Sequence, residues 1–137
     1  MTKERILIAE DEPVVRDVCV RATREDGYEI QVVASGAEAI KAAREQPFDL
    51  FLTDVRMPGM SGLEAFRAIQ EFYPDIVGVA MTGYATMEAA IEALQLGFHD
   101  FILKPFSPDE VRRAVARALE RKRLRRENAR LKALIPF

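Results

Sequence analysis

Acidic, hydroxyl and basic residues stand directly after apolar runs of this sequence. Glu10 and Asp11 follow one such run, and Asp54 ends another. Thr82 and Lys104 follow two further runs. Open parallel sheets place their ligand sites just beyond the carboxyl ends of the strands. We therefore treat Asp54 as the centre of a candidate site to which the other four residues contribute.

These residue types suit a phosphoryl group held beside a metal ion. Three carboxylates close together repel one another, and protonation or a bound cation relieves the repulsion. An oxygen-rich site with room for water suits Mg²⁺, which shares phosphate oxygens readily. Thr82 offers a hydroxyl group and Lys104 a compact positive charge, both suited to a tetrahedral oxyanion. Asp54 would then be the nucleophile that accepts the phosphoryl group.

Each of these residues alone also has an ordinary structural explanation. A carboxylate at a strand end is commonly a helix cap or a solvated loop residue, and Glu10 with Asp11 would favour a helix start through the helix dipole. A single lysine is most often a surface residue, and a single threonine often forms a turn. The chemical interpretation rests on the coincidence that every central strand ends in a suitable residue.

The elements that must position these residues alternate along the chain. Apolar or alternating runs predict five strands, at 5–9, 29–32, 49–54, 76–81 and 101–103. Helical spacing predicts helices at 13–26, 35–46, 61–73, between Gly83 and Gly97, and from Ser107 to about Leu134. The pattern predicts an α/β fold, in which a doubly wound, five-stranded parallel sheet of order 2-1-3-4-5 is covered by five helices, the last of them extended.

Several residues define the ends and faces of these helices. Three of the helices begin with a serine followed three residues later by glutamate, which predicts a capping box at Ser35, Ser61 and Ser107. The strand at 29–32 alternates polar and apolar residues, which predicts a sheet edge. The fourth helix has one apolar face, made by Met87, Ala90, Ile91 and Leu94.

Length and composition indicate one folded domain. The chain has 137 residues, with 20 Lys or Arg and 22 Asp or Glu, a balance typical of soluble proteins. No apolar run approaches the roughly 20 residues that cross a membrane, and the first run is too short for a signal peptide. The single cysteine, Cys19, excludes an internal disulfide, fits a reducing cytoplasm and is expected to be a small buried hydrophobe. We expect a cytoplasmic protein.

Four segments of the chain resemble the receiver domain of two-component response regulators, the CheY-like superfamily with a flavodoxin-like fold. They are Glu10-Asp11-Glu12, the run from Asp54 to Gly62, Thr82-Gly83-Tyr84 and Lys104-Pro105-Phe106. The resemblance runs from about Arg5 to Leu119 and keeps every element in order. It implies a phosphorelay receiver that a phosphohistidine on a sensor histidine kinase, or a phosphotransfer protein, phosphorylates on Asp54.

The resemblance also implies roles for individual residues. Asp11 and Asp54 would ligate Mg²⁺ directly, with the backbone carbonyl of Arg56 as a third ligand and Glu10 acting through water. Thr82 and Lys104 would contact the phosphoryl oxygens, and the Lys104–Pro105 peptide bond is expected to be cis.

Glu10 and Phe101 depart from the commonest pattern of the family, and His99 lies outside the family motifs. Glu10 stands where many relatives have aspartate, and its longer arm leaves its metal contacts open. Phe101 occupies the aromatic switch position without a tyrosine hydroxyl, yet it can still turn inward. His99, the only histidine, is expected at the surface or against a partner.

The charges divide the chain into an acidic body and a basic tail. Between Arg117 and Lys132 there are eight Lys or Arg and two acids, so the remainder is net negative. We assign residues 1–120 to the receiver and 121–137 to an extended helix or linker. The apolar end Ile135-Pro136-Phe137 leads us to expect an output domain beyond it, of a kind that the sequence does not specify.

The tail has the spacing of a weak coiled-coil seam, made by Leu124, Asn128, Leu131 and Ile135. It predicts a weak homodimer, helped by a face of the receiver. Since only two heptads are present, a solvated helix with incidental leucines remains the alternative.

Two other functions compete with the switch. Aspartyl phosphatases of the haloacid type carry a second aspartate two residues after the nucleophile, where this chain has Arg56, and no phosphate-binding GxxxxGK loop is present. We therefore expect a switch that catalyses only its own phosphotransfer and dephosphorylation. The basic segment 121–126 would attract nucleic acid, but no recognition fold accompanies it, so nucleic acid is expected only through an output domain.

Overall fold

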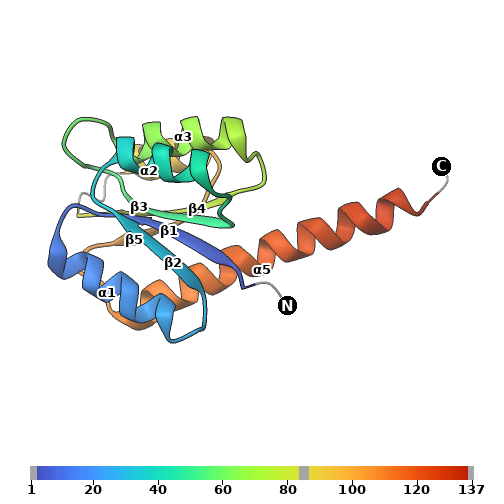
Figure 1. Ribbon diagram of the computed structural model, residues 1–137, viewed down its shortest axis with the longest axis horizontal. Helices are drawn as coiled ribbons and strands as arrows, with labels where there is room; N and C mark the ends of the chain where they lie inside the picture. Colours follow the sequence, from blue (N-terminus) through green and yellow to red (C-terminus); the bar gives the residue numbers. More distant parts are fainter. Residues whose placement is uncertain (1–2, 84–86, 136–137) are drawn as a thin grey trace.

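The computed structural model describes residues 3–83 and 87–135, in which five strands alternate with five helices (Figure 1). The strands are β1 (Arg5–Ala9), β2 (Glu29–Val33), β3 (Leu50–Asp54), β4 (Val77–Thr82) and β5 (Phe98–Leu103). The helices are α1 (Pro13–Arg24), α2 (Gly36–Glu45), α3 (Gly62–Phe72), α4 (Met87–Gln95) and α5 (Pro108–Ala133). The predicted α/β alternation is confirmed.

The strands form one parallel sheet in the order β2-β1-β3-β4-β5. The predicted order is therefore correct, and β2 lies at an edge as its alternating sequence indicated. In the register of the central strands, Ala9 lies beside Thr53, and Asp54 lies beside Met81. The carboxyl ends of β1, β3 and β4 consequently meet at one edge of the sheet.

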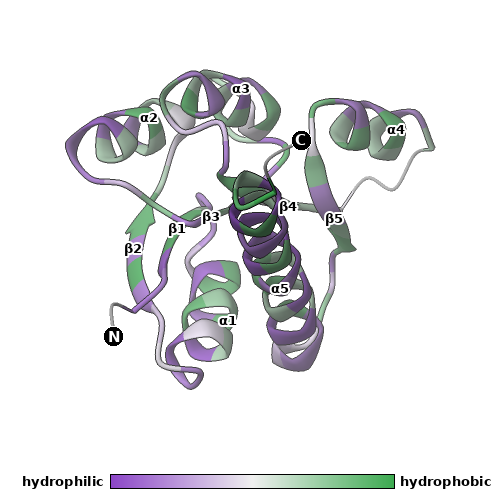
Figure 2. Cartoon of the chain, turned by 90° about the vertical axis from the view of Figure 1, so that its right-hand side faces the viewer, coloured by the Kyte–Doolittle hydropathy of each residue, from purple (hydrophilic) through white to green (hydrophobic). Residues whose placement is uncertain are grey.

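Helices cover both faces of the sheet (Figure 2). Helices α2, α3 and α4 lie on one face, and α1 and α5 lie on the other. The strands contribute alternate residues to the two cores, so that Leu7 faces the α2–α3 side whereas Ile6 and Ile8 face the α1–α5 side. Burial on both faces explains why the central strands are almost continuously apolar.

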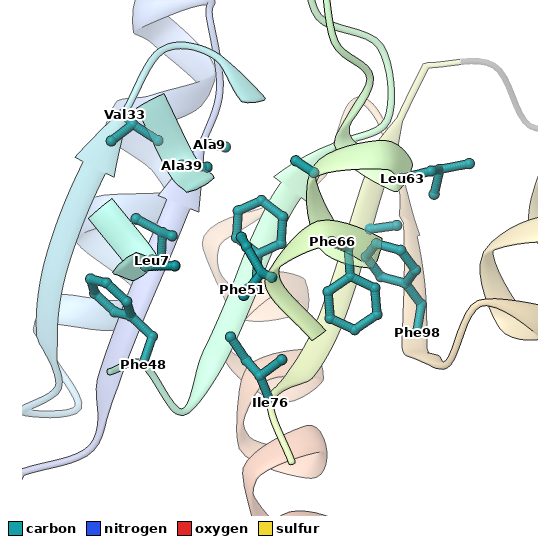
Figure 3. Close-up of a cluster of buried hydrophobic side chains, with 14 of the residues drawn as sticks. Leu7, Ala9, Val33, Ala39, Phe48, Phe51, Leu63, Phe66, Ile76 and Phe98 are labelled. Atoms are coloured by element: carbon teal, nitrogen blue, oxygen red, sulfur yellow. The ribbon is translucent and has the colours of Figure 1, made fainter. Parts of the chain in front are cut away.

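Aromatic rings fill the core between the sheet and α3 (Figure 3). The ring centroids of Phe66 and Phe98 are 4.1 Å apart, and those of Phe51 and Phe66 are 6.3 Å apart. A Cβ atom at Gly78 would lie 2.8 Å from both the Phe66 and Phe98 rings. Strand β4 therefore carries a glycine where these two rings approach its backbone.

The predicted serine caps are present, but the full capping box forms at one of the three positions. Each serine hydroxyl accepts a hydrogen bond from the backbone N–H three residues later. At Ser107 the glutamate side chain of Glu110 also accepts from the serine backbone N–H, which completes the box. The Glu38 carboxylate accepts instead from the backbone N–H of Ala34.

The structure corrects one boundary and gives the exposure of one helix face. Strand β5 begins at Phe98, three residues before the predicted start at Phe101, because Phe98 and Asp100 still pair with Gly78 and Val79 of β4, with a register shift between these two pairs. The apolar face of α4 points largely to solvent, since its larger side chains are exposed while Ala93 packs on the core.

None of the helices in the described ranges is both long and apolar enough to cross a membrane.

Candidate functional site

The sheet brings the predicted site residues to its carboxyl edge. Asp54 is the last residue of β3 and Thr82 the last residue of β4. Glu10 follows β1, and Lys104 follows β5. The backbone N–H of Lys104 donates to the carbonyl of Thr82 (2.8 Å), which fixes these two residues next to each other. All four side chains thus lie at the carboxyl ends of four separate strands of one sheet.

Asp54 is a buried carboxylate, with 5% of its surface exposed. Its Oδ2 atom accepts a hydrogen bond from Lys104 Nζ at 2.8 Å. Its Oδ1 atom accepts from the backbone N–H of Arg56 at 3.1 Å. Each carboxylate oxygen of Asp54 therefore has a hydrogen-bond donor. The donor to Oδ2 is the charged ammonium group of Lys104, and the donor to Oδ1 is the neutral backbone N–H of Arg56.

Glu10 is fully buried beside Asp54. Its Oε1 atom lies 2.9 Å from Lys104 Nζ, and its Oε2 atom accepts from the backbone N–H of Glu12 at 3.2 Å. Burial raises the pKa of Glu10 to about 7, and the charge of Asp54 adds to the rise, whereas the Lys104 ammonium opposes it. The site therefore disfavours the ionised form of Glu10, and a cation nearby favours that form.

Lys104 supplies that cation in the structure. Its Nζ atom contacts Asp54 and Glu10 and lies 3.5 Å from Glu12 Oε1. Burial alone would lower the pKa of Lys104, but the hydrogen bonds from its ammonium group to Asp54 and Glu10 outweigh burial and raise it. Lys104 is therefore protonated and positioned between two buried carboxylates.

The loop after β3 closes tightly over the end of this strand. The backbone N–H of Gly62 donates to the carbonyl of Val55 at 2.9 Å, which seats the start of α3 against the strand end. A Cβ atom at Gly62 would lie 2.0 Å from the carbonyl oxygen of Asp54 and 2.6 Å from Thr53 Oγ1. Only glycine allows this close approach of the two backbones beside Asp54.

The acidic residues of the edge form one group that suits a divalent cation. One carboxylate oxygen from each of Glu10, Asp11, Glu12 and Asp54 lies within 4.8 Å of the others. Mg²⁺ takes oxygen ligands and commonly uses few carboxylates, so the donor set fits this ion. No role was predicted for Glu12 from the sequence. Glu12 is the third consecutive acidic residue after a strand, and this position could have indicated that it belongs to the acidic group.

The structure places the remaining predicted residues as follows. Thr82 is buried at the end of β4, and Arg56 is exposed in the loop after β3. Phe101 is half-buried on β5, where it packs against the core on the α3 side. Tyr84, which belongs to the same sequence motif as Thr82, lies outside the described residues. The Lys104–Pro105 peptide bond is cis, as the resemblance implied.

Cys19 and His99 lie away from this chemistry. Cys19 is fully buried on the α1 side of the sheet, and burial raises the pKa of its thiol to about 12. It is the small buried hydrophobe that the sequence predicted. His99 is half-buried near the start of β5, at the opposite end of that strand from Lys104.

The comparison with protein families identifies the arrangement. Residues 6–116 match the family described as the response regulator receiver domain. The chain belongs to the receiver domain family. This match covers most of the chain and includes every predicted site residue, and the fold is the one that the resemblance implied.

Individual relatives agree with this assignment. The chain is 31% identical over 95% of its length to a putative response regulator NtrX-like of Rickettsia bellii, of which it covers 28%. It is 32% identical over 87% of its length to the DNA-binding transcriptional regulator NtrC of Proteus hauseri, of which it covers 25%. The chain therefore spans only about a quarter of the length of these relatives.

A solved receiver domain resembles the chain in sequence and structure. The receiver domain of the sensor histidine kinase PA1611 from Pseudomonas aeruginosa superposes with a TM-score of 0.77 and 31% identity. The match covers 87% of this chain and 99% of that one. In that protein a magnesium ion is coordinated in the active site cleft.

Proposed function

We propose that this receiver domain accepts a phosphoryl group on Asp54 from a phosphohistidine of a sensor histidine kinase or a phosphotransfer protein. A carboxylate oxygen of Asp54 attacks phosphorus, the bond from phosphorus to the histidine nitrogen breaks, and the imidazole leaves as the new acyl phosphate forms. The observation that carries the proposal is a buried Asp54 carboxylate held by Lys104 within a group of four acids.

Separate residues of the chain would bind the metal ion and the phosphoryl group. Asp11 and Asp54 would hold Mg²⁺, with the Arg56 carbonyl as a third ligand and Glu10 acting through water. When bound, the ion supplies positive charge for the phosphoryl oxygens and for the crowded carboxylates. Lys104, which is protonated and already within 2.8 Å of Asp54, would contact a phosphoryl oxygen.

Thr82 and Phe101 would form the switch. A phosphoryl oxygen that accepts a hydrogen bond from the Thr82 hydroxyl draws the end of β4 inward. This movement makes room for Phe101, which is half-buried in the structure, to become fully buried. The phosphoryl group shifts the equilibrium because it contacts the inward state better than the outward state.

Labelling with acetyl phosphate tests the proposed function. We expect intact-mass spectrometry to show one added phosphoryl group, dependent on Mg²⁺ and absent in Asp54→Asn. On the same samples, the fluorine signal of labelled Phe101 should shift in the native chain but not in Thr82→Ala. Labelling of Asp54→Asn, or labelling unchanged by a chelator, would contradict the assignment of Asp54.

The chain would act as a switch, catalysing only its own phosphotransfer and dephosphorylation. Residues 1–120 would form the receiver. In a chain that continues past residue 137, the helix from residue 121 would connect the receiver to an output domain, and contact with nucleic acid would come through that domain. The relative NtrC, described as a DNA-binding transcriptional regulator, supports an output of this kind.

A weak homodimer would form through the tail helix and the exposed apolar face of α4. Leu124, Leu131 and Ile135 are exposed on the tail, and Met87 and Ile91 are exposed on α4. Pairing of two tails would bury this seam. Pro136 and Phe137, which follow it, lie outside the described residues.

Sedimentation measurements on the full chain test the dimer. We expect Leu131→Glu to weaken self-association at least tenfold, because it places two like charges across the seam. Glu120→Gln, on the same helix but outside the seam, serves as the control and should sediment like the native chain. Equal association of Leu131→Glu and the control would show that the tail seam pairs no chains.

A further inference from the structure

Ion pairs join the basic tail to the acidic body. Three ion pairs lie where α5 passes the amino-terminal edge of the sheet. Lys122 Nζ lies 3.1 Å from Asp49 Oδ1, Arg126 lies 3.3 Å from the same oxygen, and Arg123 pairs with Glu4. These contacts begin just beyond the last apolar residue that the helix buries.

Asp49 connects four elements at this edge. Its Oδ2 atom accepts from the backbone N–H of Arg5 at 2.9 Å, and its own N–H donates to the Arg5 carbonyl at 2.8 Å. Its carbonyl accepts from the N–H of Val77 at 3.2 Å and from Lys122 Nζ at 3.2 Å. A single residue thus holds together the start of β1, β3 and β4 and the side of α5.

Lys122 is the charged residue of the tail that the fold buries most deeply among those described. Only 5% of its surface is exposed, although it stands in the basic segment 121–126. A buried ammonium group is costly unless it is paired and hydrogen-bonded. Asp49 meets both needs with its carboxylate and its carbonyl oxygen.

Beyond Leu119, the tail helix buries no apolar side chain among the described residues. Leu124 and Leu131 are both exposed, and α5 leaves the body as a single long helix (Figure 1). A helix of about 14 residues has little stability in water on its own. The ion pairs of Lys122 and Arg126 with Asp49, together with the Arg123–Glu4 pair, therefore stabilise the helix where it leaves the domain.

We propose that Asp49, Lys122 and Arg126 form a basal clamp, which extends the folded receiver to Arg126 and fixes the direction in which the tail helix leaves it. Asp49 directly precedes β3, and Asp54 is the last residue of the same strand. The tail is thereby held next to the start of the strand that carries the candidate phosphoryl acceptor. The clamp depends on the ion-pair geometry alone and stands whether or not Asp54 is phosphorylated.

Hydrogen exchange of the full chain tests the clamp. In Lys122→Met we expect the amides of residues 120–133 to exchange about tenfold faster, because the helix loses a charged hydrogen-bonded pair at its exit. Arg125→Met is the matched control: it removes an exposed arginine of the same helix for which the described residues show no ion pair. Its exchange should equal that of the native chain.

The variant Arg126→Met and the amides of β3 distinguish loss of the clamp from general unfolding of the domain. Arg126→Met keeps the Lys122–Asp49 pair and should raise tail exchange by about threefold. The amides of β3 report the stability of the sheet in every sample. If Lys122→Met and Arg126→Met both leave the tail as protected as Arg125→Met does, relative to β3, the clamp does not exist.

Distance measurement tests the fixed direction. Spin labels on Glu45→Cys and Lys132→Cys, in the presence of excess unlabelled chain, report one intramolecular distance between the body and the tail. The buried Cys19 stays unlabelled because its thiol is inaccessible. We expect a narrow distribution in the native chain and in Arg125→Met, and a broad one in Lys122→Met. Equal widths in all three would refute a role of the clamp in orienting the helix.

Discussion

Replacing Lys104 by methionine should lower the free energy of unfolding by about 3 kcal/mol in the presence of a chelator. The change removes the ammonium group that contacts both Glu10 and Asp54, and it leaves these two buried carboxylates without that charge. Breaking a buried charge pair costs more than the pair contributes, because the remaining charge stays desolvated. Chemical denaturation of the two chains measures the difference.

The loss in Lys104→Met should depend on pH. The pKa of Glu10 in the folded chain is raised to about 7, whereas its ordinary value is 4.5. Between these values the folded state binds a proton that the unfolded state has released, so stability falls as the pH rises through this window. Without Lys104 the pKa of Glu10 rises further, and the loss should be smaller at pH 5 than at pH 8.

Mg²⁺ should return most of the stability that Lys104→Met loses. A divalent cation at the same carboxylates replaces the missing positive charge, and binding to the folded state alone stabilises that state. Lys41→Met, at an exposed position of α2, is the control and should change stability by less than about 0.5 kcal/mol. A chelated Lys104→Met chain as stable as this control would show that Lys104 does not stabilise the acidic group.

Replacing Gly62 by alanine should lower the free energy of unfolding by about 3 kcal/mol and weaken the Mg²⁺ response. The new methyl carbon would lie 2.0 Å from the Asp54 carbonyl oxygen, so the backbone itself must move. Because Gly62 also donates to Val55, this movement separates the start of α3 from the end of β3. The shift would displace Asp54 from Lys104. Melting curves recorded with and without Mg²⁺ measure both effects.

Gly83→Ala provides the matched control for this prediction. Gly83 also lies at the carboxyl edge of the sheet, directly after Thr82, but a Cβ atom there would meet nothing within 4 Å. We expect its effect on stability to stay within about 0.5 kcal/mol. If Gly62→Ala matches Gly83→Ala, the loop after β3 can relax, and the close approach to Asp54 is not required.

The order of the elements and the centre of the site were predictable from the sequence. Each signal is local: branched apolar runs define the strands, and Asp54, Thr82 and Lys104 stand at their ends. Parallel pairing with right-handed crossovers then leaves few arrangements, and all of them place these ends on one edge. That is why Asp54 and Lys104, which are 50 positions apart, could be expected to meet before any distance was known.

Other features were decided only by the tertiary structure, because they depend on which surfaces meet. Helix spacing shows that Met87 and Ile91 share a face with Leu94, but not that this face points to solvent. Composition shows a basic tail, but not that Lys122 is buried against Asp49, a contact between residues 73 positions apart. Whether a charged side chain is buried or paired depends on the residues that pack around it in the folded domain. These residues are distant in the sequence, so the spacing of residues along the chain does not identify them.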